Sequence, residues 1–219
     1  MNHDPRLTLK PSHVRSELAL PVAVGLEYEQ RLWRLGYSLI AGIDEAGRGC
    51  LAGPVVAAAV IFPEDAQVPG VRDSKKLSAG NRGRLETKIR AGATAIGVGT
   101  CSPEEIDELN ILWASMEAMR RAVEALSADP NFLLIDGNRC FPRCRWPHET
   151  LVKGDDRSHS IAAASIIAKT HRDRLMVDLD REHPVYKWAS NKGYPTRDHY
   201  RALAKHGPTR HHRRSFRLQ

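Results

Sequence analysis

The sequence predicts one α/β domain: a mixed β-sheet flanked by helices, with a helical C-terminal appendage. The apolar run at residues 55–62 is typical of a strand that is covered on both faces. Only about nine residues separate it from an earlier predicted strand at residues 38–44, too few for a helical crossover. These two strands should therefore pair antiparallel. Further along the chain, strand-like apolar segments alternate with segments of helical periodicity, as in α/β proteins.

The elements around this strand pair follow from local patterns. Apolar spacing predicts a short amphipathic helix at residues 27–35, before the first strand. A second helix is expected at residues 77–91, with Asp73 or Ser78 as its N-cap. Residues 94–100 read as a third strand, whose glycines allow close packing against a neighbour.

A strong helix start follows at Ser102-Pro103-Glu104-Glu105, which combines an N-cap serine, a proline in the first turn and a capping-box glutamate. Apolar residues recur at spacings of three and four from Ile106 to Leu126. We therefore expect one helix that continues until Asp129-Pro130 and packs on the core.

The rest of the chain predicts two more strands and two more helices. Strands are expected at residues 132–136 and 149–152, and a long helix at residues 160–179, which His183-Pro184 ends. A final helix is expected at residues 197–205. In terms of organisation, we expect a loose tail at 1–20, a main domain at 21–183 and a helical extension at 184–219.

The composition favours a basic protein that binds polyanions. Lys and Arg number 33 against 26 Asp and Glu, which gives a net charge of +7. No apolar run approaches the roughly 18 residues that a membrane span needs, and the N-terminus lacks the apolar stretch of a secretory signal. We expect a cytoplasmic monomer without membrane contact.

Four cysteines are present, and only Cys140 and Cys144 are close in sequence. A zinc site would need two further ligands, and His148 could supply only one of them. In a chain without a signal peptide, free thiols are the favoured interpretation for all four, including Cys50 and Cys101.

Acidic residues follow three of the predicted strands: Asp44-Glu45, Asp136 and Asp155. Ligands of open α/β sheets gather at strand ends, so these four carboxylates could meet in one cleft and hold divalent cations. Each acid also has an ordinary interpretation as a turn or loop residue. Adjacent strand residues point to opposite faces, so Asp44 and Glu45 share a site only if the strand twists or ends there, or if Glu45 reaches around.

The turn Gly47-Arg48-Gly49 comes directly after the first acids. Glycine lets the backbone approach a ligand closely, and arginine suits phosphate. A cation next to a phosphate site indicates phosphodiester chemistry on a nucleic acid.

In these and other segments the sequence resembles bacterial ribonuclease HII from about residue 38 to residue 216. The resemblance is carried by the following segments: Asp44-Glu45-Ala46-Gly47-Arg48-Gly49, Leu51-Ala52-Gly53-Pro54, Asp73-Ser74-Lys75-Lys76-Leu77, Ile106-Asp107-Glu108-Leu109-Asn110, Ile135-Asp136-Gly137-Asn138, Val152-Lys153-Gly154-Asp155, Lys192-Gly193-Tyr194-Pro195 and His206-Gly207-Pro208-Thr209.

The resemblance implies a ribonuclease H-like fold and a metal-dependent endoribonuclease. Its substrates would be RNA/DNA hybrids and duplex DNA containing ribonucleotides, with a role in ribonucleotide excision repair. Cleavage 5′ of the ribonucleotide, by two-metal-ion hydrolysis with Mn²⁺ or Mg²⁺, would leave 3′-hydroxyl and 5′-phosphate ends. The implied metal-binding and catalytic residues are Asp44, Glu45, Asp136 and Asp155.

Substrate contacts are implied in the same way. Gly47, Arg48, Gly49 and Tyr194 would read the RNA-to-DNA junction, while Lys75, Lys76 and the basic run at 210–214 would hold phosphates. Asp173 competes for the fourth metal-ligand position, but we expect it to form an ion pair on a helix surface. Cys50 stands where the family often has proline.

Three alternatives are weighed against this hypothesis. A junction resolvase of related fold would cut DNA without a ribonucleotide. A catalytically silent nucleic-acid-binding protein is disfavoured because all four carboxylates are present. A dinucleotide-binding enzyme is discarded, since an apolar strand rather than a helix follows Gly47 and Gly49.

Overall fold

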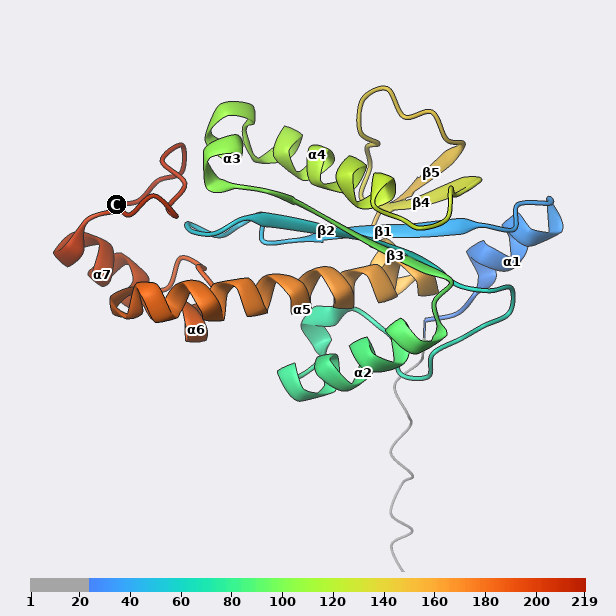
Figure 1. Ribbon diagram of the computed structural model, residues 1–219, viewed down its shortest axis with the longest axis horizontal. Helices are drawn as coiled ribbons and strands as arrows, with labels where there is room; N and C mark the ends of the chain where they lie inside the picture. Colours follow the sequence, from blue (N-terminus) through green and yellow to red (C-terminus); the bar gives the residue numbers. More distant parts are fainter. Residues whose placement is uncertain (1–23) are drawn as a thin grey trace, which may run out of the picture.

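The computed structural model describes residues 24–219, which form a five-stranded sheet with helices on both faces (Figure 1). The predicted tail at 1–20 lies outside the described residues. The strand order is β3-β2-β1-β4-β5. The strands are β1 (Ile40–Ala46), β2 (Val55–Ile61), β3 (Ala95–Cys101), β4 (Phe132–Asp136) and β5 (His148–Leu151).

Seven α-helices and three 3₁₀ turns are found in the described chain. The α-helices are α1 (Glu27–Arg34), α2 (Ala79–Gly92), α3 (Pro103–Leu109), α4 (Ile111–Glu124), α5 (His159–Glu182), α6 (Trp188–Asn191) and α7 (Arg197–His206). The 3₁₀ turns are η1 (Ser74–Lys76), η2 (Gly154–Asp156) and η3 (Pro184–Tyr186).

The sheet is mixed, as predicted. β1 pairs antiparallel with β2, and β2 pairs antiparallel with β3. β4 runs parallel to β1, and β5 runs parallel to β4, so these three strands end at the same edge of the sheet. The predicted bounds of the first strand are wrong: it begins at Ile40 and continues through both acids to Ala46, because β2 pairs with it along this length.

The single helix expected after Ser102 is also wrong, although its capping box is confirmed. Asn110 has a positive φ of 66°, which ends α3, and its side-chain oxygen accepts hydrogen bonds from the backbone N–H groups of Leu112 and Trp113. Asparagine tolerates this conformation and is a strong N-cap, so it starts a second helix at a changed direction. Of the two N-caps proposed for the helix at 77–91, Ser78 is confirmed for α2, whereas Asp73 caps the separate turn η1.

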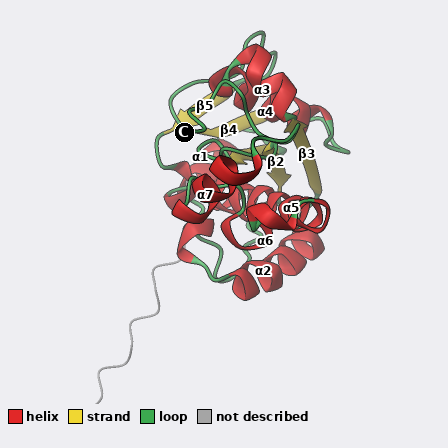
Figure 2. Cartoon of the chain, turned by 90° about the vertical axis from the view of Figure 1, so that its left-hand side faces the viewer, coloured by secondary structure: helices red, strands yellow, loops and turns green. Residues whose placement is uncertain are grey.

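Helices α3 and α4 cover one face of the sheet, and α5 and α2 cover the other (Figure 2). The apolar side chains of β2 are buried throughout and contribute to both layers of the core. Close packing at β3 depends on its glycines: a Cβ at Gly97 would lie 2.0 Å from the carbonyl oxygen of Ala122 on α4. The role expected for these glycines is therefore confirmed.

The C-terminal part contains two short elements that sequence patterns did not indicate, η3 and α6. Trp188 is fully buried there and packs in a small core with Leu51, Ala52 and Met176. The segment after α5 is thereby fastened to the loop that follows β1. Within residues 24–219, no helix is long and apolar enough to cross a membrane.

Candidate active site

The ends of three parallel strands bring the predicted acids to one edge of the sheet. Asp136 is the last residue of β4, and Asp155 lies in η2, just after β5. The pairing of β1 with β4 stops at Ile43 and Ile135, whereas β1 stays paired with β2 up to Ala46. The sheet therefore opens beside Asp44 and Glu45, and Asp136 stands at this opening.

Asp44 is buried, with 4% of its surface exposed. One carboxylate oxygen accepts a hydrogen bond from the backbone N–H of Glu45 at 2.7 Å. The hydroxyl of Ser165 on α5, which lies 2.9 Å from that of Ser74, is close enough to lower the pKa of this carboxyl. Burial, together with the charges of Glu45, Asp136 and Asp155, holds the pKa of Asp44 well above its usual value. No sequence pattern had indicated a role for Ser165 at the site.

Glu45 lies on the opposite face of β1 from Asp44. Ile43, two residues earlier, packs in the core under α4, whereas a Cβ at Gly42 would touch α5. Even so, the charge of Asp136 raises the pKa of both acids, in each case after the larger effect of burial. β1 does not end between the two acids. Instead the neighbouring strand β4 ends, so side chains on both faces of β1 come close to Asp136.

The backbone next to Asp155 holds the side chain of Asp136 in place. An oxygen of Asp136 accepts a hydrogen bond of 2.7 Å from the N–H of Gly154. Asp155 is 7% exposed, and burial followed by the charge of Asp136 raises its pKa, which the ammonium of Lys75 at 3.6 Å partly offsets. The carboxylates of Asp136 and Asp155 therefore lie close together, and the one ammonium beside them does not balance their negative charge.

The chemistry of these four side chains fits hard divalent cations. All donors are carboxylate oxygens, which Mg²⁺ and Mn²⁺ prefer, and a cation would relieve the repulsion that raises the pKa values of Asp44, Glu45 and Asp155. In the described chain the tightest groups, with three ligand atoms within 4.8 Å, lie elsewhere: Cys140, Cys144 and His148, and Glu182, His183 and His211.

The two glycines of the turn after β1 have different reasons for being glycine. Gly47 has a φ of 101°, and a Cβ there would lie 2.1 Å from Nε of Arg172. Gly49 is exposed, and a Cβ there would meet no atom within 4 Å. The fold therefore requires glycine at 47, while at 49 the protein leaves open space beside its backbone.

Two fully buried arginines hold this loop in place, and neither was predicted. Arg172 of α5 donates hydrogen bonds to the carbonyl groups of Ala52, Pro54 and Lys192. Arg213 donates to the carbonyls of Arg48 and Gly53. The expectation that the whole run at 210–214 binds phosphates is wrong for Arg213, because its guanidinium is used inside the protein.

A histidine network, formed by His199 and His212 together with the buried indole of Trp188, supports the backbone of Tyr194. Nδ1 of His199 lies 3.0 Å from the carbonyl oxygen of Tyr194, which can only accept, so this nitrogen carries the proton. Nε2 of His199 then accepts from the indole N–H of Trp188 and from His212, both at 3.1 Å. Nδ1 of His212 accepts from the N–H of Thr209. Both histidines are therefore neutral and fully hydrogen-bonded.

The side chain of Tyr194 is 40% exposed beside the Gly47–Gly53 loop. The ammonium of Lys169 lies 5.5 Å from the centre of its ring, and the Cys50 thiol is close enough for a hydrogen bond to the tyrosine hydroxyl. Burial raises the pKa of Cys50. Cys50 therefore packs against the ring of Tyr194, the residue for which the resemblance implies a role in substrate recognition.

The remaining predicted residues lie around the acids. Arg48 is exposed, and its guanidinium lies 3.2 Å from the carboxylate of Glu45. Lys76 pairs with Asp156 at 2.5 Å, beside the Lys75–Asp155 contact. The ion pair expected for Asp173 is confirmed, with Lys169 at 2.6 Å and Arg82 at 3.2 Å, although its side chain is only 15% exposed and does not lie on the helix surface.

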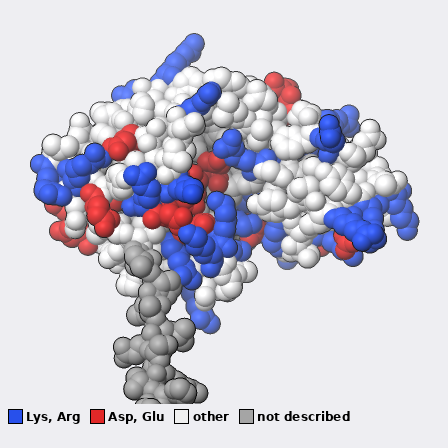
Figure 3. Space-filling model, turned by 180° about the vertical axis from the view of Figure 1, so that it is seen from behind, with Lys and Arg blue, Asp and Glu red and all other residues white. Residues whose placement is uncertain are grey.

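On the face seen in Figure 3, acidic side chains gather near the middle, and Lys and Arg side chains lie on both sides of them. Positive charge beside a group of carboxylates is the pattern expected where a polyanion is bound over cations. This arrangement agrees with the net charge of +7.

Comparison with protein families gives a match over most of the chain. The sequence model of the Ribonuclease HII family matches residues 41–219. A ribonuclease HII of Salinibacter ruber is 57% identical over 196 residues, which cover 88% of this chain and 98% of that protein. A ribonuclease HII of Vibrio campbellii is 47% identical over 211 residues, which cover 96% and 95%.

Solved structures agree. Ribonuclease H2 of Pyrococcus horikoshii superposes with a TM-score of 0.68 at 27% identity, over 82% of this chain and 94% of that one. Ribonuclease HII of Archaeoglobus fulgidus, solved with PCNA, gives 0.68 at 28% identity, over 83% and 96%. The predicted ribonuclease H-like fold is confirmed.

Proposed function

The chain belongs to the ribonuclease HII family and is a metal-dependent endoribonuclease acting on RNA/DNA hybrids; from this premise we propose that it also cuts duplex DNA 5′ of single embedded ribonucleotides, leaving 3′-hydroxyl and 5′-phosphate ends. The observation that carries the proposal is the meeting of Asp44, Glu45, Asp136 and Asp155 where β4 stops pairing with β1. The Gly47–Gly53 loop begins at the same opening.

We assign these four carboxylates to the divalent cations of the reaction, Mg²⁺ or Mn²⁺. Bound there, two such ions would activate the attacking water and stabilise the charge on the leaving oxygen. The four carboxylates would hold the ions together, because the charge of Asp136 raises the pKa of each of the other three carboxyl groups. Lys75 and Lys76 hold the flanking phosphates, since their ammonium groups lie beside the acids and are more than half exposed.

Ribonucleotide reading is assigned to the loop and Tyr194. The open space at Gly49 lets backbone groups approach a 2′-hydroxyl, which is the feature that separates RNA from DNA. The exposed ring of Tyr194 is placed to stack on the sugar of the following deoxynucleotide. The buried arginines hold the loop rigid, so the backbone groups that contact a 2′-hydroxyl keep fixed positions.

The test uses a DNA duplex that contains one ribonucleotide, with Mg²⁺ or Mn²⁺ added. We expect the wild-type protein to cut it and Asp44→Asn to lose activity. Asp178→Asn makes the same chemical change at an exposed position on α5 and should retain full activity. An all-DNA duplex of identical sequence should stay intact.

Two results would contradict the proposal. Equal cleavage by wild type and Asp44→Asn would remove Asp44 from the reaction. Cleavage of the all-DNA duplex would instead favour the junction-resolvase alternative.

A further inference from the structure

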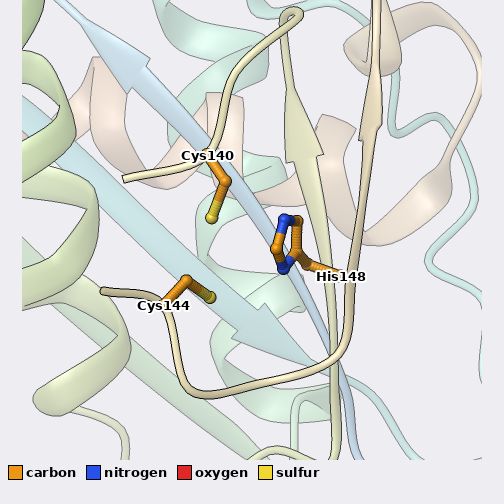
Figure 4. Close-up of side chains that lie close together, drawn as sticks. All are labelled: Cys140, Cys144 and His148. Atoms are coloured by element: carbon orange, nitrogen blue, oxygen red, sulfur yellow. The ribbon is translucent and has the colours of Figure 1, made fainter. Parts of the chain in front are cut away.

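Cys140 and Cys144, on the connection between β4 and β5, lie together with His148, the first residue of β5, outside the carboxylate cluster. Their two sulfur atoms and one ring nitrogen lie within 4.8 Å of one another. Figure 4 shows the three side chains pointing toward a common space. None of the four cysteines forms a disulfide. The sequence supplied a cysteine pair with one candidate histidine, and the structure brings that histidine to the pair.

Hydrogen bonding orients His148 as a ligand. Its Nδ1 lies 3.0 Å from the carbonyl oxygen of Trp146, which can only accept a hydrogen bond. Nδ1 therefore carries the proton, and Nε2 presents its lone pair. A carbonyl that fixes the tautomer in this way is the usual support of a metal-binding histidine. The Cys144 thiol donates to the same carbonyl at 3.5 Å, so both side chains are aligned by one group.

The connection that carries these residues lacks the helix that normally links parallel strands. β4 and β5 are parallel neighbours, yet residues 137–147 contain no helix or strand. Phe141 inserts into the core between the two cysteines, and Arg143 takes a positive φ of 56°. The segment therefore folds back over the sheet with one buried anchor and few backbone hydrogen bonds.

We propose that Cys140, Cys144 and His148 bind one Zn²⁺ ion, with water in the fourth position, and that this ion fastens the β4–β5 connection. Thiolate and imidazole ligands select zinc, whereas the carboxylate cluster suits hard cations, so one chain holds two chemically distinct metal sites. His148 is exposed, which leaves the ion accessible to water. Thiolates rather than thiols bind zinc, so zinc binding releases protons and strengthens as pH rises.

Elemental analysis of the full-length protein, purified under reducing conditions without chelator, tests the proposal. We expect about one zinc per chain, in keeping with a single three-ligand site. After removal by chelator, added Zn²⁺ should restore this stoichiometry and raise the midpoint of thermal unfolding. Co²⁺ should give the absorption of thiolate-bound tetrahedral cobalt.

Variants locate the ion. Cys144→Ser and His148→Asn should lose both the stoichiometric zinc and the absorption of thiolate-bound cobalt. Cys101→Ala, which removes a buried thiol on β3, should keep both. His148 is exposed, so its variant should fold even if Cys144→Ser does not. Zinc retained equally by both variants would overturn the proposal. A Cys140–Cys144 disulfide, seen as two thiols that react only after reduction, would overturn it as well.

Discussion

The carboxylate cluster and the histidine network both consist of buried polar side chains. They differ in how well neighbouring groups of the protein balance their charges and complete their hydrogen bonds. Around Asp44 the neighbouring charges are mainly negative, and the pKa of the carboxyl is raised. Around His199 and His212 every ring nitrogen has a hydrogen-bond partner that fits the neutral form. Within residues 24–219, the four carboxylates of the first group pair only with Arg48 and Lys75, whereas the hydrogen bonds of the second group are complete.

This difference separates the parts of the site that perform chemistry from those that hold its shape. Repulsion among carboxylates destabilises the metal-free fold and is removed by cations, so it provides metal affinity. Hydrogen bonds among the histidines and from the buried arginines fix the surface that reads the substrate. Removing a charge from the first region should therefore cost activity, and removing a donor from the second should cost stability.

The largest effect is expected at Asp44. Asp44→Asn should lower kcat by about 10²–10³-fold or more, on the scale of losing one electrostatic group of a catalytic site. The same variant should unfold at a higher temperature than wild type in the absence of metal. The folded-state pKa of Asp44 lies above its unfolded value of 3.8, so the penalty is absent below that value and grows as pH rises through the folded pKa. Scanning calorimetry at acidic and neutral pH checks this, and a variant that is less stable at neutral pH would contradict it.

Arg213→Met should lower the free energy of unfolding by about 3 kcal/mol, because the carbonyls of Arg48 and Gly53 lose their buried donor. Its exposed neighbour is the matched control. Arg214→Met should change stability by less than about 0.5 kcal/mol and should instead weaken binding of a nucleic-acid duplex at low salt. Urea unfolding and binding at two salt concentrations separate these outcomes; equal stability of the two variants would contradict the structural role of Arg213.

Acidification should weaken the histidine network. Burial lowers the pKa of His212 to about 4, below its usual 6.5. Its contribution is therefore fully present above pH 6.5 and is lost as pH falls toward 4, up to about 2 kcal/mol. The slope of stability against pH in this window should be shallower for His212→Asn than for wild type. Identical slopes would show that His212 does not titrate on unfolding.

The smallest effects distinguish the two glycines of the turn. Gly47→Ala should cost about 1–2 kcal/mol, because its φ is positive and Arg172 occupies the space of a Cβ. Gly49→Ala should leave stability within about 0.5 kcal/mol but reduce cleavage at an embedded ribonucleotide. Thermal unfolding and cleavage assays on both variants check the pair. Full activity of a stable Gly49→Ala would remove Gly49 from substrate reading.

Much of the fold was predictable because its signals are local. The antiparallel pair followed from the short connection before the apolar strand at Val55. Asp136 ends its strand and Asp155 lies just beyond the next one, as predicted, whereas Asp44 and Glu45 lie within β1. The break between α3 and α4 had a local signal as well, since Asn110 is a good N-cap, but a continuous apolar stripe outweighed it. Periodicity is preserved across such a break, so it cannot show where one helix ends.

The supports of the site were not predictable, because they depend on contacts between distant segments. Arg213 lies in a basic run that is typical of an exposed surface, and its burial depends on the carbonyl of Gly53. Arg172 and His199 likewise satisfy groups on other segments. Asp44 and Glu45 can both approach Asp136 because the neighbouring strand β4 stops beside them. No pattern within the sequence of β1 shows where β4 stops.

Mapping the cut at nucleotide resolution tests the central claim most directly. The substrate is a DNA duplex with one ribonucleotide, labelled at either end, incubated with wild-type protein and Mn²⁺ or Mg²⁺. The account predicts a single cut on the 5′ side of the ribonucleotide, with a 3′-hydroxyl on the upstream fragment and a 5′-phosphate on the ribonucleotide. A cut elsewhere, or an equal cut in the matched all-DNA duplex, would contradict it.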